Sequence, residues 1–126
     1  MAHILVIDDH TAVRKTIRRA LELDGHQVTE AADGVEGMRR FGERPVDLVV
    51  TDILMPNREG IETIIELRRA NPALPILAVS GGSTNSDRDG ILASANLLGA
   101  SRVLAKPFSL GELGATVSAL LDAAVR

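Results

Sequence analysis

Five side chains of the kinds that bind cations or phosphoryl groups follow short apolar runs in this sequence. They are Asp8, Asp9, Asp52, Ser80 and Lys106. Carboxylates held within a few ångströms of one another repel unless protons or a cation neutralise them, and a hard divalent cation is the simpler solution. Mg²⁺ prefers oxygen ligands, keeps several waters and usually takes one or two carboxylates. If the aspartates meet in the fold, the sequence therefore predicts a magnesium site.

Other metal ions fit the sequence less well. The ligand spacing of a calcium-binding EF-hand is absent. Zinc sites use cysteine and histidine, but the chain has no cysteine, and His3, His10 and His26 are scattered. His10 follows the acidic pair, and we interpret it as a loop residue.

A carboxylate beside Mg²⁺ can attack a phosphoryl group, because the metal ion neutralises the incoming charge and fixes the geometry of attack. Asp52 would then become an aspartyl phosphate. Lys106 would supply a positive charge for the phosphoryl oxygens, and Ser80 a hydroxyl donor. The glycines at 81–82 would let backbone N–H groups come close. Each residue alone has an ordinary surface explanation, and only the combination favours this chemistry.

These side chains must be positioned by the alternating strand and helix patterns of the chain. Four continuous apolar runs are typical of strands buried on both faces: Ile4–Ile7, Leu48–Val50, Ile76–Val79 and Val103–Ala105. A weaker strand pattern covers Gln27–Glu30. Apolar residues at helical spacing predict five amphipathic helices, with core positions at Val13, Ile17, Leu21, Val35, Met38, Phe41, Ile61, Ile64, Ile65, Leu92, Ala95, Leu98, Leu110, Leu113, Val117, Leu120 and Leu121. The alternation predicts a doubly wound α/β domain.

In an open parallel sheet, ligands collect outside the carboxyl ends of the strands. Polar residues at the expected strand ends recur at intervals of roughly 22–28 residues, which suits one helix, one strand and two turns. These strand-end residues are Asp8, Asp9, Glu30, Asp52, Ser80 and Lys106. We therefore expect them to converge at one edge of the sheet.

The composition excludes several other classes of function. The 126 residues correspond to about one domain, and 45% hydrophobic residues suffice for a core. A formal charge of −3 gives no basic field, so we expect no direct nucleic-acid binding by this chain. The lack of cysteine excludes disulfides and thiolate chemistry. No basic leader or apolar stretch of about 18 residues occurs, which predicts a soluble intracellular chain with no membrane insertion.

Taken in order, the motifs resemble those of the receiver domain of two-component response regulators. They are Asp8-Asp9, Asp52 followed by Met55-Pro56 and Gly60, Ser80, and Lys106-Pro107. The resemblance covers essentially the whole chain, 1–126, and implies a flavodoxin-like fold with five parallel strands in the order 2-1-3-4-5 and five helices. It implies a phosphoacceptor switch of the bacterial cytoplasm, not an enzyme beyond self-phosphorylation and self-dephosphorylation. Its partners would be a histidine kinase or histidine phosphotransfer protein and a downstream protein target.

The resemblance also implies how the site is used. Asp52 would be the phosphorylated residue. Asp9, Asp52 and the backbone carbonyl of Leu54 would hold Mg²⁺ directly, and Asp8 would act through water. The cofactor implied is therefore Mg²⁺.

Further roles implied by the resemblance concern the switch. Ser80 would provide the switch hydroxyl and Lys106 the phosphate-binding cation, and the bond between Lys106 and Pro107 would be cis. The family's aromatic switch position, three residues before the lysine, is Val103 here, which has no ring to swing. We hypothesise that the segment 81–90, rich in Gly, Ser, Asn and Asp, carries the signal instead; an inert insertion is the alternative.

Two other classes of function remain open. A Mg²⁺-dependent phosphohydrolase usually has a second aspartate two residues after its nucleophile, and here Leu54 follows Asp52 and His10 follows Asp8 at that spacing. A binding module is the other class. A flavin carrier needs aromatic side chains that stack on the flavin, and this sequence lacks them. A receiver-like scaffold that is never phosphorylated would keep the same acidic pocket.

The sequence leaves the partners open. Arg14 and Lys15 at the start of the first helix are expected to be exposed, either simply solvated or in contact with a kinase. The cognate kinase, the stimulus, the downstream target, the oligomeric state and the phosphoryl lifetime do not follow from the residues. A single-domain regulator and a receiver cut from a longer regulator are equally compatible with them.

Overall fold

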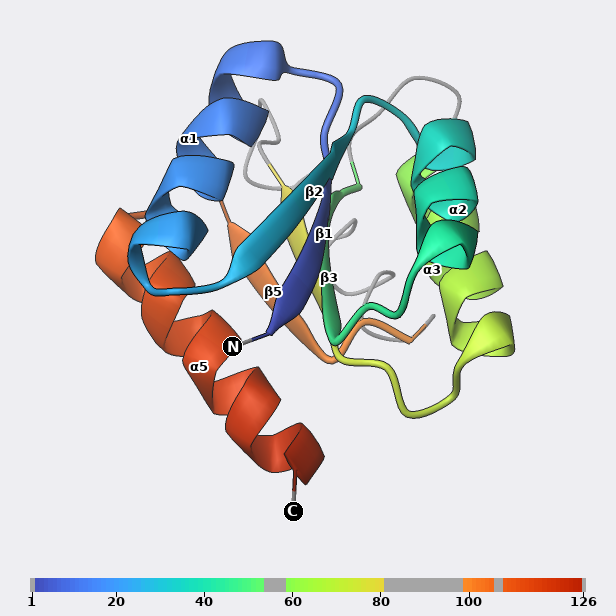
Figure 1. Cartoon of the computed structure of the whole chain (residues 1–126). Coiled ribbons are helices and arrows are strands. Elements are labelled where there is room, and N and C mark those ends of the chain that lie inside the picture. Colours follow the sequence, from blue (N-terminus) through green and yellow to red (C-terminus); the bar gives the residue numbers. More distant parts are fainter. Residues whose placement is uncertain (1, 54–58, 81–98, 106–107, 126) are drawn as a thin grey trace.

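The computed structural model describes residues 2–53, 59–80, 99–105 and 108–125. Within them, strands and helices alternate along the chain (Figure 1). The strands are β1 (His3–Ile7), β2 (Gln27–Ala31), β3 (Leu48–Asp52), β4 (Ile76–Ser80) and β5 (Arg102–Ala105). The helices are α1 (Thr11–Leu23), α2 (Gly34–Glu43), α3 (Glu59–Ala70) and α5 (Leu110–Val125). The further helix predicted around Leu92, Ala95 and Leu98 lies outside the described residues.

The five strands form one parallel sheet in the order β2-β1-β3-β4-β5. This is the doubly wound topology and the strand order expected from the sequence. The weak strand pattern at Gln27–Glu30 is edge strand β2, which extends to Ala31. Strands β1 and β3 are buried along their whole length, as continuous apolar runs in a sheet covered on both faces require.

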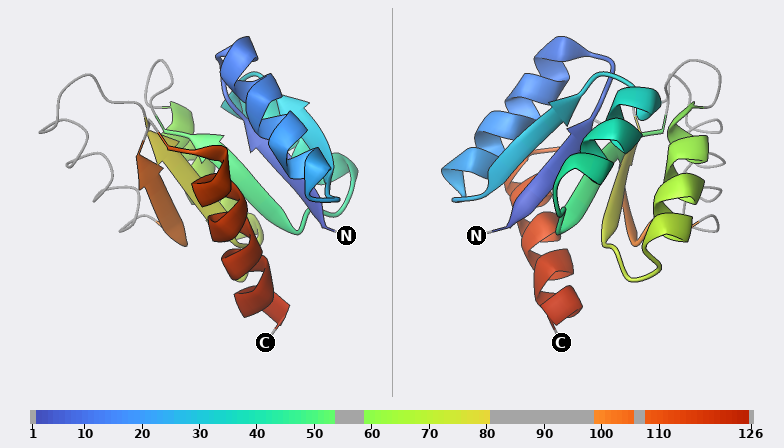
Figure 2. Two further views of the ribbon diagram at one scale, coloured as in Figure 1. Left: turned by 90° about the vertical axis from the view of Figure 1, so that its left-hand side faces the viewer. Right: turned by 45° about the vertical axis from the view of Figure 1, so that its right-hand side comes forward.

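Side chains along each strand point alternately to the two faces of the sheet, and each face has its own hydrophobic cluster. In β1, Ile4 and Val6 join the cluster beneath α1 and α5, whereas Leu5 and Ile7 join the cluster beneath α2 and α3. The two pairs of helices lie on opposite sides of the sheet in Figures 1 and 2. Among the described helices, none combines the length and apolar character needed to span a bilayer.

Two apolar helix residues that we expected in the core lie at the surface instead. Val35 is 79% exposed and Leu110 is 49% exposed. Helix α2 packs so closely on β1 that a Cβ atom at Gly37 would lie 2.5 Å from Ile7 Cδ1, so glycine forms its buried face and Val35 turns to solvent. Leu110 is the first residue of α5, whose buried face begins at Leu113. Both predictions were wrong because helical spacing alone does not locate the face of contact.

A second glycine sets how closely α3 approaches the end of β3. Gly60 is buried in the first turn of α3. A Cβ atom there would lie 2.5 Å from Ile53 Cα and would also meet the carbonyl oxygen of Asp52. Backbone atoms cannot move aside as the end of a flexible side chain can. Glycine at this position therefore lets α3 begin directly beside Asp52.

Replacing Gly60 by alanine should lower the free energy of unfolding by about 1–3 kcal/mol, because the added methyl group overpacks against backbone atoms. Gly42→Ala is the matched control, since Gly42 is also helical and no atom lies within 4 Å of its Cβ position. There the higher helix propensity of alanine should raise stability by about 0.5–1 kcal/mol. Urea denaturation measures both, and equal effects of the two substitutions would contradict the packing argument.

Candidate metal centre

The predicted carboxylates meet at the carboxyl edge of the sheet. Asp8 directly follows β1, and Asp52 is the last residue of β3. One ligand atom from each of Asp8, Asp9, His10 and Asp52 lies within 4.8 Å of the other three. Asp8 and Asp52 are only 1% and 2% exposed, whereas Asp9 and His10 lie at the surface. The cluster is therefore anchored in the sheet on one side and open to solvent on the other.

The pairing of β1 with β3 brings the cluster together. Ile7 pairs with Thr51, so Asp8 and Asp52 are the next residues on two adjacent strands. The Asp8 N–H donates to the last carbonyl of β2 at 3.1 Å. The Asp8 carboxylate accepts a hydrogen bond from the backbone N–H of His10 at 2.8 Å. Hydrogen bonds thus hold both the backbone and the side chain of Asp8.

The set of donor atoms suits a hard divalent cation. Asp8, Asp9 and Asp52 supply carboxylate oxygens, which are the ligands that Mg²⁺ prefers. Placing two buried carboxylates this close costs free energy that a divalent cation offsets. The Asp9 side chain is 32% exposed, so an ion bound there keeps contact with water, as Mg²⁺ requires. The residues present therefore fit a magnesium ion.

The other residues predicted for the site are only partly placed. Ser80 ends β4 and pairs with Ala105, one position beyond the pairing of Val79 with Asp52. The backbone of Ser80 thus reaches the same edge of the sheet as Asp52. Outside the described part lie the side chain of Ser80 and the residues Leu54, Lys106, Pro107 and 81–90.

Val103, which the resemblance assigns to the aromatic switch position, lies in the described part of the structure. It lies on β5, pairs with Ala78 and is partly buried. Its side chain packs against the hydrophobic cluster beneath α2 and α3. A β-branched aliphatic side chain in this position has one stiff torsion and no ring to turn.

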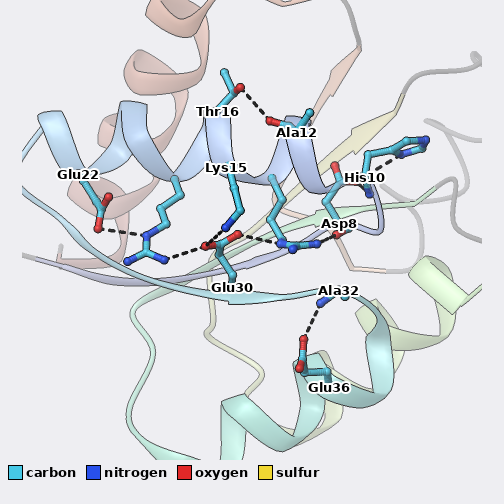
Figure 3. A network of polar contacts seen from close by, with 11 residues as sticks. Asp8, His10, Ala12, Lys15, Thr16, Glu22, Glu30, Ala32 and Glu36 are labelled. Atoms are coloured by element: carbon cyan, nitrogen blue, oxygen red, sulfur yellow. Dashed lines mark hydrogen bonds and ion pairs between the residues drawn. The ribbon is translucent and has the colours of Figure 1, made fainter.

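A network of charged side chains ties α1 and β2 to the acidic cluster (Figure 3). Glu30 on β2 accepts hydrogen bonds from Arg14 Nε at 2.8 Å and from Arg18 Nη1 at 2.7 Å, and it lies 3.6 Å from Lys15 Nζ. Arg14 Nη1 also donates to the backbone carbonyl of Asp8 at 2.8 Å. The guanidinium group of Arg14 therefore links Glu30 to the backbone of a residue in the cluster.

Arg14 is not the exposed residue that we expected. Its side chain is 12% exposed, whereas that of Lys15 is 63% exposed. Sequence reasoning missed the pairing with Glu30, although a signal was present. Arg14 and Arg18 are four residues apart and share one helix face, and the next strand ends in Glu30-Ala31. Of Arg14 and Lys15, the two residues expected to be exposed, only Lys15 lies at the surface.

The network lowers the pKa of the Glu30 carboxyl. Burial by itself would raise that pKa, but hydrogen bonds from Arg18 and Arg14 and the charge of Lys15 outweigh it. The hydrogen bond to Glu30 is also the main cause that raises the pKa of Arg18. The ion pairs therefore stabilise the folded chain at neutral pH, where both partners are charged.

Comparison with known proteins identifies the family. The model of the response regulator receiver domain family matches residues 4–118. The chain belongs to this family. It is 41% identical over 118 residues to response regulator MprA of Mycobacterium sp. strain KMS and 40% identical over 118 residues to MprA of Mycobacterium ulcerans. Both matches cover 94% of this receiver domain, and the chain spans about half the length of these curated relatives.

Solved structures of receiver domains share the fold. A CheY-like receiver domain protein from Methanospirillum hungatei superposes with a TM-score of 0.87 at 25% identity, covering 98% of this chain and 96% of that one. A receiver domain protein from Clostridium thermocellum gives 0.86 at 31% identity, covering 97% and 95%. NtrX from Brucella abortus gives 0.90 at 26% identity, covering 98% of this chain but 27% of NtrX. Receiver domains thus occur both as most of a chain and as a small part of one.

The lowered pKa of Glu30 gives the receiver domain a testable pH dependence. A carboxyl whose pKa falls on folding stabilises the fold above its unfolded pKa, near 4.5, and that contribution is lost as the pH drops through the folded pKa. Glu30→Gln should lower the free energy of unfolding at pH 7 by about 1–2 kcal/mol, because two charge-assisted hydrogen bonds are lost. The difference from wild type should shrink as the medium becomes more acidic.

Glu22→Gln is the matched control for this prediction. Glu22 pairs with Arg18 across one helical turn, but both side chains are more than 40% exposed, at 44% and 43%. Its loss should cost less than about 0.5 kcal/mol. Denaturation curves at several pH values compare the two variants. Equal losses, or a Glu30→Gln effect that does not change with pH, would show that the buried pairing is not the cause.

Proposed function

We propose that this receiver domain is the phosphoryl-accepting component of a two-component phosphorelay, and that Asp52 is the acceptor. The donor is a phosphohistidine of a histidine kinase or a histidine phosphotransfer protein. A carboxylate oxygen of Asp52 forms the new bond to phosphorus, while the bond from phosphorus to the histidine nitrogen breaks and its electron pair stays with that nitrogen. The observation that carries the proposal is the placement of buried Asp52 within 4.8 Å of Asp8 and Asp9.

The surroundings of Asp52 support its role as the nucleophile. It ends a strand that is fully buried, so the scaffold behind the carboxylate is rigid. Gly60 brings the start of α3 against its backbone. Asp9 and Asp52 would hold Mg²⁺ directly, together with the carbonyl of Leu54, and Asp8 would act through water. When bound, the ion neutralises the charge of the incoming phosphoryl group.

Two further residues complete the proposed machinery. Ser80 would donate its hydroxyl to a phosphoryl oxygen, and Lys106 would pair its ammonium group with another. Phosphorylation adds a charge of roughly −1.5 to −2 at this edge of the sheet. The hydroxyl of Ser80 and the ammonium group of Lys106 would therefore move toward the phosphoryl oxygens. Because Val103 has no ring to follow the hydroxyl, the change would reach a protein-binding surface by another route. The segment 81–90 remains our proposal for that route.

The partners follow from the family only in outline. Response regulators act between kinases and downstream targets, and the proposed setting is the bacterial cytoplasm. The matched relatives are about twice as long as this chain, so their activity as whole proteins is not transferred to it. The downstream partner proposed here is a protein that binds the phosphorylated surface.

The phosphoacceptor role can be tested with a small phosphodonor and Mg²⁺, followed by intact mass measurement. Wild type should gain one phosphoryl group, and Asp52→Ala should gain none. Asp122→Ala is the matched control, because Asp122 is an exposed aspartate on α5, far along the chain from the cluster, and should be phosphorylated like wild type.

Other outcomes point to the rival functions. Release of many phosphates per protein would favour a phosphohydrolase. Absence of any adduct, in a protein that still folds, would favour a binding scaffold that is never phosphorylated. A phosphoryl group retained in Asp52→Ala would move the acceptor to another residue and contradict the assignment.

A further inference from the structure

His10 occupies a position in which its backbone is held on both sides. It is the N-cap residue of α1, with φ −88° and ψ 105°. Its N–H donates to Asp8 Oδ1 at 2.8 Å, and its carbonyl accepts from the N–H of Arg14 at 2.9 Å. Its side chain makes no capping hydrogen bond, although serine, threonine, aspartate and asparagine usually fill this position in order to make one. The backbone of His10 is therefore held in place, while its imidazole ring makes no capping hydrogen bond to the helix.

The ring of His10 lies among the carboxylates. Its Nδ1 atom is 3.2 Å from Asp9 Oδ1 and 3.6 Å from Asp8 Oδ1, and it belongs to the group of four ligand atoms that includes Asp52. Figure 3 shows His10 beside Asp8 where β1 leads into α1. His3 is engaged elsewhere, with Pro45 and Thr29. The sequence indicates a loop residue after the acidic pair at His10, and the structure places its ring at the cluster.

These separations match the spacing of ligands around one ion. With metal–ligand bonds of about 2.1 Å, adjacent ligand atoms in an octahedral site lie about 3.0 Å apart, and opposite ones about 4.2 Å apart. The 3.2 Å between His10 Nδ1 and Asp9 Oδ1 fits an adjacent pair. The whole group, within 4.8 Å, needs only a slight contraction. The ring is 66% exposed, so a small rotation is unhindered.

We propose that His10 is an additional metal ligand of the acidic site and widens its cation range from Mg²⁺ to Co²⁺, Ni²⁺ and Zn²⁺. Imidazole nitrogen suits these ions, whereas Mg²⁺ takes oxygen and gains little from it. With the carboxylates of Asp9 and Asp52 and the imidazole of His10, the site becomes a mixed oxygen and nitrogen centre. This inference rests on the proposed function, because it assumes that the same carboxylates bind a divalent cation.

The alternative is that His10 serves only as a cationic partner of Asp9. Both arrangements place the ring near the carboxylates, but they differ in what metal binding does. A ligand gains a bond to the ion and discriminates between metals. If His10 only pairs with Asp9, any divalent cation that binds the carboxylates breaks that pair, and His10 does not favour one metal ion over another.

Metal affinities of the untagged full chain test the proposal by calorimetry with Co²⁺ and with Mg²⁺. His10→Ser keeps a good N-cap residue but removes the nitrogen. It should weaken Co²⁺ binding about tenfold or more and change Mg²⁺ binding less than about twofold. His26→Gln is the matched control, because His26 precedes β2 at the opposite edge of the sheet. It should leave both affinities unchanged.

A spectroscopic readout identifies the ligand directly. With ¹⁵N-labelled histidine, NMR of the chain loaded with diamagnetic Zn²⁺ should show one imidazole whose Nδ1 signal is strongly shifted, and that signal should disappear in His10→Ser. Equal loss of Co²⁺ and Mg²⁺ affinity, or the absence of any shifted imidazole, would overturn the role of His10 while leaving the acidic site intact. Failure of the wild-type chain to bind either ion would instead overturn the metal site of the proposed function.

Discussion

The constraint on which the rest of this structure depends is the mutual repulsion of carboxylates at the end of a buried sheet. The ligand atoms of the cluster lie within 4.8 Å of one another, and at that upper limit two unit charges repel by about 3–4 kcal/mol at an effective dielectric constant of 20. Asp8 and Asp52 are almost completely buried, so water offers them little relief. A fold that holds them together must be stabilised elsewhere, and it must leave the cluster open to a cation on its outer side.

The hydrophobic sheet supplies that stabilisation, and it does so with contacts that also set the geometry of the site. The alternation of β1 residues between two clusters fixes the register of the strand, because a shift by one residue would turn Leu5 and Ile7 to the wrong face. The same register decides that Asp8 follows Ile7 beside Asp52. The packing of the sheet therefore also determines the geometry of the site. In addition, Arg14 links Glu30 to the backbone carbonyl of Asp8 through two hydrogen bonds.

The predictions from sequence succeeded for features set by the local pattern of residues, such as the strands and their ends. They failed for features set by packing between elements, such as which helix face is buried and which charges pair. Continuous apolar runs located the strands, and their ends located Asp8 and Asp52. Helical spacing did not reveal that Gly37 rather than Val35 meets the sheet, because a glycine packed against the side chain of Ile7 adds nothing to an apolar pattern. The spacing of Arg14 and Arg18 placed them on one helix face, but their partner Glu30 lies on another element, so that spacing alone did not show that Arg14 is buried.

His10 is a further residue whose surroundings the sequence pattern did not show. Its position outside the core means that the fold does not depend on it, whereas the donor atoms around a bound cation would. The buried aspartates belong to the sheet, so changing them disturbs the packing and register that the whole domain needs. His10 lies outside that core, with its backbone fixed by two hydrogen bonds and its ring mostly in solvent. A change at such a position alters the donor atoms around an ion at little cost in stability. The proposed role of His10 would thus set the metal preference of this domain through one surface residue at the start of α1, without altering the sheet.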